Sequence, residues 1–173
     1  MTSSMQFELL EPPDLSGERD LAHLRALMRV ARIIDAAGEG VLGRGAPAIM
    51  YQSGRDVGRR EGYAARRVPG LDEALAIVLS EGEEAWRFER WRDPGQEGLW
   101  MKEGPTRATW LLFRRCPLLT LARDSGSIQG GILCQALHGY IAGSLERIMG
   151  HRLEIRIGHC GPRACKILVE MKD

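Results

Sequence analysis

Apolar residues recur at helical spacing in the first part of the chain, alternate with polar residues in the middle, and return to helical spacing later. Residues 20–38 carry apolar side chains three or four apart, which predicts an amphipathic helix that ends at Gly38. Residues 46–67 predict a second helix, residues 70–79 a short third one, and residues 127–149 a long apolar one. The buried stripe expected on the first helix is Leu21, Leu24, Leu27, Met28, Ala31 and Ile34.

The strand-type stretches lie between and after these helices. Residues 83–91, 98–104 and 106–115 predict three antiparallel strands joined by Gly and Pro turns. HRLEIRI (151–157) alternates apolar and polar residues, and CKILVE (165–170) is rich in β-branched residues, so together they predict a closing hairpin. The expected fold class is α+β, an antiparallel sheet with helices packed on one face.

Length and charge favour a single ordinary globular domain. The chain has 173 residues, shows no internal repeat and predicts one domain, with a strand (5–10) and helix in residues 1–40 and the core in residues 41–173. The net charge of +1 gives no overall electrostatic footprint for direct nucleic-acid binding. No apolar run reaches the roughly 20 residues of a membrane span, and the first residues lack a signal-peptide pattern, so we expect a cytoplasmic protein without membrane contact.

Glycines recur on two of the predicted helices at positions that leave one side bare. Gly54, Gly58 and Gly62 are four residues apart, and Gly139 and Gly143 repeat the spacing. Each glycine costs about 1 kcal/mol relative to alanine inside a helix, so a compensating close contact is expected. Packing of helices within the chain is the favoured interpretation, and a homodimer interface is the alternative. The neighbouring arginines are expected on a solvated face: Arg55, Arg59, Arg60, Arg66 and Arg67.

Two cysteines flank the predicted turn of the closing hairpin. Cys160 precedes Gly161-Pro162, and Cys165 follows that turn. Their proximity suggests a metal clip, a disulfide or a redox pair, and cytoplasmic thiols favour the first and last of these.

The later part of the chain resembles the 4-vinyl-reductase-type domain. The resemblance covers roughly residues 40 to 170. Its most specific part is the spacing of Cys134, Gly139, Tyr140, Gly143, Gly150 and Cys160. Such domains serve as small-ligand sensors in phenol-responsive transcription activators and as stand-alone hydrocarbon-binding proteins, and occur in methanogen redox regulators and a bacteriochlorophyll biosynthesis protein. The resemblance therefore implies a fold like that of the TRAPP vesicle-tethering subunits, and a homodimer.

The resemblance also implies a structural zinc site made of thiolates. Cys134 and Cys160 match the helix and strand ligands of the phenol sensors, and Cys165 matches the last ligand if the turn is shorter here. The glutamate of that family falls on Ile157, which cannot bind a metal. His159, two residues later on the same strand, is one candidate replacement.

Cys116 is the other candidate for the fourth ligand. It ends a predicted strand, and the helix to Gly150 and the returning strand have comparable lengths, roughly 24 and 33 Å from their rises per residue. All four cysteines are therefore expected at one end of the domain. Zinc is favoured over an iron–sulfur cluster, with a reversible disulfide or plain buried thiols as the alternatives.

Aromatic residues concentrate on the central strands, where the resemblance implies a ligand pocket. The tryptophan that contacts ligand in the phenol sensors falls on Phe113, and the histidine falls near Ala85. An apolar or aromatic small molecule is the expected ligand. The candidate ligand-binding residues are Trp86, Phe88, Trp110, Phe113 and Tyr140.

No catalytic constellation is recognisable, so an enzyme is not expected. The favoured function is a stand-alone sensor or carrier of a small hydrophobic molecule that signals through a separate regulatory protein. The alternatives are a cysteine-based redox or iron–sulfur regulator, and an accessory protein of tetrapyrrole metabolism, suggested by the family resemblance alone.

Overall fold

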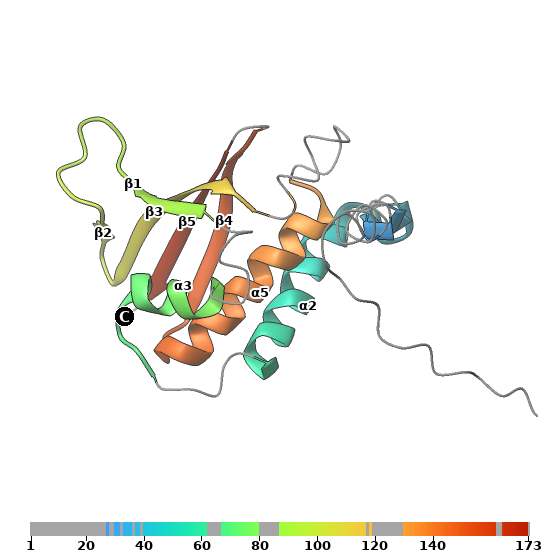
Figure 1. Ribbon diagram of the computed structural model, residues 1–173, viewed down its shortest axis with the longest axis horizontal. Coiled ribbons are helices and arrows are strands. Elements are labelled where there is room, and N and C mark those ends of the chain that lie inside the picture. The colour runs from blue at the N-terminus through green and yellow to red at the C-terminus, as the bar shows by residue number, and fades with distance from the viewer. Residues whose placement is uncertain are drawn as a thin grey trace, which may run out of the picture.

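The protein is an α+β domain in which helices cover an antiparallel sheet (Figure 1). The computed structural model describes residues 40–61, 67–79, 87–116, 130–161 and 164–172, together with Leu118 and single positions between 27 and 38. The described helical segments are η1 (Gly43–Gly45), α2 (Ala46–Glu61), α3 (Leu71–Leu79) and α5 (Ile132–Met149). The described strands are β1 (Arg87–Trp91), β2 (Met101–Glu103), β3 (Thr106–Arg115), β4 (Leu153–Cys160) and β5 (Cys165–Lys172).

The sheet has the order β1-β3-β5-β4, and the short β2 also pairs with β3. Every pairing is antiparallel, which confirms the fold class expected from the sequence. Alternation places Leu111 and Phe113 of β3 on the helix-facing side with Ile167 of β5, and all three side chains are buried. These residues share one apolar core with α3 and α5.

The last residues of α3 and α5 match the sequence expectations, but α5 begins at Ile132 instead of residue 127, and Arg67, expected in the second helix, is not helical. Gly150 ends α5 in the left-handed conformation, with φ of 75° and its N–H donating to the Glu146 carbonyl. Gly38 does not end the first helix, since Gly38 and residues 40–42 are themselves helical. The expected strand over residues 5–10 lies outside the described residues.

The first helix also presents a different face from the expected one. Leu27 and Ile34 are exposed, whereas Asp35 is buried. The Asp35 carboxylate accepts a 3.0 Å hydrogen bond from the backbone N–H of Leu133 in the first turn of α5. A carboxylate at a helix N-terminus satisfies a free donor and interacts favourably with the helix dipole. Asp35 therefore faces the interior, whereas the apolar residues Leu27 and Ile34 of the same helix face solvent.

Helices α2 and α5 pack against each other at very close range (Figure 1). The glycines at this contact are Gly54, Gly58, Gly139 and Gly143. A Cβ at Gly58 would overlap the Tyr140 carbonyl oxygen, and a Cβ at Gly143 would overlap the Arg55 carbonyl oxygen. The glycine stripe therefore serves packing within the chain, as favoured, and these four positions are not a dimer surface. Gly62 lies outside the described residues.

A buried ion pair crosses the same helix contact. Arg55 of α2 and Glu146 of α5 are paired, with side chains only 8% and 7% exposed. Arg59 adds a 2.7 Å hydrogen bond from Nε to Glu146 Oε2. The expectation that Arg55 lies on a solvated face is therefore wrong, because its guanidinium faces a carboxylate across the helix pair.

The same polar groups cover the edge of β4. The Leu153 N–H donates to Glu146 Oε1 at 2.8 Å, and the Leu153 carbonyl accepts from Arg55 Nη2 at 2.9 Å. Two residues further along β4, the Ile155 N–H donates to the Tyr51 hydroxyl at 2.9 Å. An edge strand exposes backbone groups that need partners, and side chains of α2 and α5 supply them here.

Candidate functional site

Three of the cysteines meet where α5 begins and the closing hairpin turns. Cys160 ends β4 and faces Cys165, the first residue of β5, with the two Sγ atoms 3.1 Å apart. Cys134, in the first turn of α5, hydrogen-bonds to Cys160. Cys134 and Cys165 are each 7% exposed, and Cys160 is half-buried. None of the four cysteines is in a disulfide. We call Cys134, Cys160 and Cys165 the thiol cluster.

A β-bulge at Gly158 brings Cys160 into the thiol cluster. The pairing of β4 with β5 shifts between Ile157 and His159, so one residue is inserted on β4. The insertion sends the exposed His159 outward and turns Cys160 toward Cys165. His159 therefore does not share the face of Ile157, and its proposed role as a fourth metal ligand loses its structural basis. A Cβ at Gly158 would lie 2.6 Å from the Trp110 ring, so this position suits glycine alone.

The thiols polarise one another. Hydrogen bonding from Cys160 lowers the pKa of Cys165 to about 7, and it also lowers the pKa of Cys134. The pKa of Cys160 is raised because its proton is shared with both neighbours. The thiol cluster therefore favours a thiolate on Cys165 or Cys134 and a proton on Cys160.

The contact geometry fits a zinc site poorly. Two thiolates bound to one tetrahedral zinc at about 2.3 Å lie about 3.8 Å apart, whereas Cys160 and Cys165 are 3.1 Å apart. Within the described part of the chain, no group of three or more His, Cys, Asp or Glu side chains is arranged to hold a metal ion. Cys116 is buried in the apolar core that also contains Cys165. The expected zinc or iron–sulfur site stays an untested prediction.

Two phenylalanines lie beside the thiol cluster on the helix-facing side of the sheet. Phe113 is opposite Cys165 in the β3–β5 register and is 3% exposed. Its ring centroid is 5.8 Å from that of Phe88 on β1, with the rings tilted by 37°. Phe113 therefore lies in the core with Phe88 packed against it, and ligand contact by this pair stays a prediction.

The other aromatic candidates are placed differently. Trp110 lies on the opposite face of β3, where the Lys166 ammonium is 4.3 Å from its ring centroid. Alternation along β3 turns Trp110 away from the helix-facing side, as expected for a residue opposite in face to Phe113, and its role in ligand binding stays a prediction. Tyr140 is half-buried on α5, and its backbone packs against Gly54 and Gly58. Trp86 lies outside the described residues.

His138 was not singled out as a binding residue from the sequence, yet it is the buried imidazole of α5. It lies one helical turn after Cys134 and is 7% exposed. Its Nδ1 atom has no hydrogen-bond partner, which is unusual for a buried polar atom. Burial lowers the pKa of His138 to about 4, so the ring is neutral at pH 7. The sequence signal was a histidine on the apolar face of the predicted long helix.

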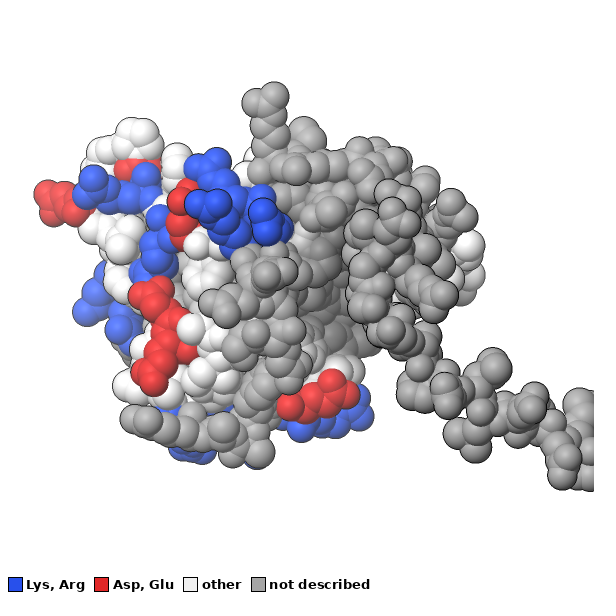
Figure 2. All heavy atoms as spheres, in the orientation of Figure 1, with Lys and Arg blue, Asp and Glu red and all other residues white. Residues whose placement is uncertain are grey.

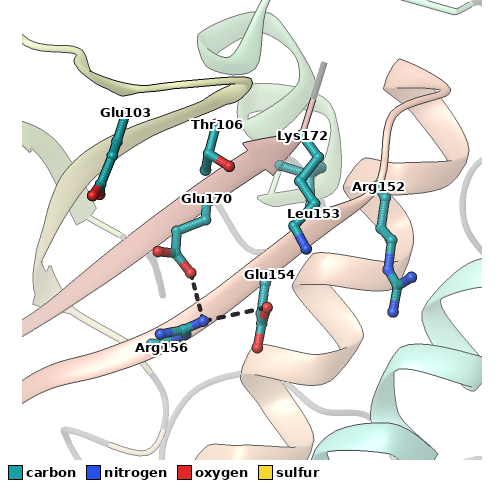
Figure 3. Close-up of a pocket in the computed structure, with 8 residues that line it drawn as sticks. All are labelled: Glu103, Thr106, Arg152, Leu153, Glu154, Arg156, Glu170 and Lys172. Atoms are coloured by element: carbon teal, nitrogen blue, oxygen red, sulfur yellow. Dashed lines mark ion pairs between the residues drawn. The ribbon is translucent and has the colours of Figure 1, made fainter.

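The pocket drawn in Figure 3 is chemically different from this core. It has a volume of about 230 Å³ and is lined by Glu103, Thr106, Arg152, Leu153, Glu154, Arg156, Glu170 and Lys172. Arg156 pairs with Glu170 at 3.1 Å and with Glu154 at 3.6 Å (Figure 3). The pocket lies at the β4 start, at the opposite end of the hairpin from the thiol cluster. Because its lining is mostly charged and polar, this pocket does not suit the expected apolar ligand.

The surface view agrees with the near-zero net charge. Basic and acidic side chains interleave on the described part of the face in Figure 2. Among the described residues, no helix combines the length and apolar character needed to cross a membrane.

Comparison with known proteins supports the fold. No known protein family matches the chain, and no curated protein matches it by sequence. The structure is similar to the crystal structure of the phenol-responsive sensory domain of the transcription activator PoxR with phenol. That match has a TM-score of 0.53 and 16% sequence identity, and it covers 86% of this chain and 74% of the other. At this identity the likeness concerns the fold, so membership of the 4-vinyl-reductase-type family and the TRAPP-like assignment stay predictions.

Proposed function

We propose that the protein is a small-molecule sensor module that binds an apolar ligand carrying one hydrogen-bonding group. The ligand lies on the helix-facing side of the sheet, between the Phe88–Phe113 pair and the first turns of α5. The observation that carries this proposal is the unpartnered Nδ1 atom of His138 inside an apolar core. The similarity in fold to a phenol-responsive sensory domain supports the same chemical class of ligand.

The phenylalanines and His138 contribute different parts of the proposed ligand recognition. Phe113 and Phe88 supply an apolar aromatic surface on the sheet. His138 supplies the polar contact, because a buried unsatisfied group costs about 1–3 kcal/mol that a ligand hydroxyl would recover. A neutral imidazole can accept a hydrogen bond from such a hydroxyl at Nδ1 or donate one to its oxygen, depending on its tautomer.

The position of the site links it to the rest of the fold. His138 shares its helix with Cys134, and Phe113 faces Cys165 in the β3–β5 register. Ligand binding would therefore be felt at the thiol cluster and along α5. No observation on the described residues favours the tetrapyrrole-metabolism alternative.

A pair of probes that differ in one hydroxyl group tests this function. Titration calorimetry with phenol and with toluene should show binding of both, with phenol preferred. Phe113→Ala should weaken both probes at least tenfold, and His138→Leu should remove the preference for phenol while retaining toluene. Leu112→Trp, on the other face of β3, is the control and should bind like the parent protein. Failure of both probes to bind the parent protein would refute the proposal.

We also propose that the chain forms a homodimer through its exposed apolar row. The row comprises Leu27, Val30, Ile33, Ile34, Val41, Leu42 and Ile49, all exposed. Leu27, Ile34 and Val41 are seven residues apart, the spacing with which a helix face pairs with a second copy of itself. Exposed apolar rows of this length mark interaction sites on globular proteins, and a self-complementary interface is the commonest kind.

A further inference from the structure

The geometry points to a modification site that is independent of the proposed ligand: Cys160 and Cys165 form a reversible intramolecular disulfide when the protein meets a hydroperoxide. The two residues are direct partners across the antiparallel β4–β5 ladder and close its turn. Their Sγ atoms are already 3.1 Å apart, and a disulfide needs about 2.05 Å. Oxidation therefore requires a movement of about 1 Å at the side chains and none of the strand pairing.

The backbone at this point also suits a disulfide. Residues directly opposite each other in an antiparallel pair have Cα atoms roughly 4.5–5.5 Å apart, within the roughly 4.4–6.8 Å range of disulfides. The Gly161 N–H donates to the Ala164 carbonyl at 3.0 Å, which holds the turn between the two cysteines. The cross-link would thus close a turn that is already formed.

The 3.1 Å distance also separates this site from a structural metal centre. It is shorter than the spacing of about 3.8 Å between two thiolates on one zinc. The bulge at Gly158 is what aligns Cys160 with Cys165. The chain therefore places the two sulfurs in contact with each other.

The third thiol of the cluster, Cys134, connects the state of the cysteine pair to α5. Cys134 hydrogen-bonds to Cys160 in the reduced protein, and that contact is lost when Cys160 bonds covalently to Cys165. Either sulfur of the pair can react first, since the other lies in contact with it. Since Cys134 lies in the first turn of α5, oxidation is transmitted to the helix that also carries His138.

The chemistry balances with one hydroperoxide. One of the two sulfurs attacks as a thiolate on the nearer peroxide oxygen, the O–O bond breaks, and the departing hydroxide or alkoxide takes a proton, leaving a sulfenic acid. The other sulfur then attacks the sulfenic sulfur, the S–O bond breaks, and water leaves with the proton of the attacking thiol. Two thiols and one hydroperoxide give one disulfide, one water, and a second water or an alcohol. A dithiol reductant reverses the reaction.

Peptide mapping of the full chain tests the proposal. The reduced, desalted protein is treated with one equivalent of hydrogen peroxide, alkylated without reduction, and digested. We expect two of the four thiols to be lost, a Cys160–Cys165 cross-linked peptide lighter by two hydrogens, and full recovery with dithiothreitol. Cys160→Ser should abolish the cross-link, whereas Cys116→Ser, the control, should retain it.

Several results would overturn the proposal. Four thiols still titratable after treatment would do so, as would a dominant Cys134–Cys160 or intermolecular disulfide. Irreversible sulfinic or sulfonic acid at Cys165 without a cross-link would also contradict it. Elemental analysis of the native protein is a further test. One equivalent of bound zinc that prevents oxidation until a chelator removes it would show that these cysteines form a metal site and not a redox pair.

Discussion

The Arg55 guanidinium of α2 and the Glu146 carboxylate of α5 are paired in the interior, and both also bind the backbone of Leu153 at the start of β4. Two helices and an edge strand are thus joined by one polar network. Burial raises the pKa of Glu146, but hydrogen bonds from Arg55, from the Leu153 N–H and from Arg59 outweigh it and leave the pKa below its ordinary value. The carboxylate is therefore charged in the folded protein at neutral pH.

Removing the charge of Glu146 should destabilise the protein strongly. Glu146→Gln leaves the buried Arg55 without its counter-ion, a change that typically costs about 3–5 kcal/mol. Because the folded pKa of Glu146 is depressed, its stabilisation is present above the ordinary carboxyl pKa and is lost as pH falls through the folded value. Urea unfolding at several pH values measures both effects.

The control for this prediction is the exposed ion pair between Glu154 and Arg156 on β4. Glu154→Gln removes a carboxylate that is 49% exposed and pairs with Arg156, so it should change stability by no more than about 1 kcal/mol. Equal losses in Glu146→Gln and Glu154→Gln would contradict the assigned role of the buried pair.

Adding one methyl group at the helix contact should separate α2 from α5. Gly143→Ala places a Cβ against the Arg55 carbonyl, which cannot move away without shifting the helix. We expect a loss of about 1–3 kcal/mol, typical of overpacking. Gly40→Ala is the matched control, since nothing lies within 4 Å of its Cβ, and it should be neutral or stabilise by up to about 1 kcal/mol. Thermal unfolding that ranks the two variants the other way would disprove the close-contact explanation.

His138 should make stability fall between pH 6.5 and about 4. Burial lowers its folded pKa to about 4 from an ordinary value of 6.5, so the unfolded chain binds a proton in this interval and the folded protein does not. The free energy of unfolding then decreases as pH falls, by up to about 1.4 kcal/mol per pH unit. His138→Leu should remove this slope from denaturant curves measured at pH 7, 6 and 5. His151→Gln, at an exposed histidine, should keep it, and a slope that persists in His138→Leu would assign the effect elsewhere.

Charged substitutions in the exposed apolar row should dissociate the proposed homodimer. Val41 is 83% exposed, so Val41→Lys should convert the dimer to a monomer without lowering the melting temperature of the monomer. Light scattering coupled to size exclusion measures the mass. Leu99→Lys, at an exposed residue outside the row, is the control and should stay dimeric. A parent protein that is monomeric at all concentrations would exclude the dimer.

Much of the architecture could be predicted from local patterns. The strand expected over residues 106–115 matches β3 residue for residue, and the Gly150 stop of α5 was also expected. The gathering of Cys134, Cys160 and Cys165 was predicted from the family resemblance and the lengths of α5 and β4. The faces were harder to predict. The bulge at Gly158 is not detected by counting alternating residues along the strand. Because of it, Cys160 faces Cys165 and His159 points outward.

The sequence by itself determined the order and type of most elements, because periodicity, turn glycines and chain length act over a few neighbouring residues. Only the tertiary structure decided which polar groups enter the interior. Asp35 turned inward where it meets the free N–H of Leu133, and Arg55 became buried because Glu146 lies opposite it on another helix. The free energy of a buried charge depends on a partner distant in sequence, and no local pattern records where that partner will be.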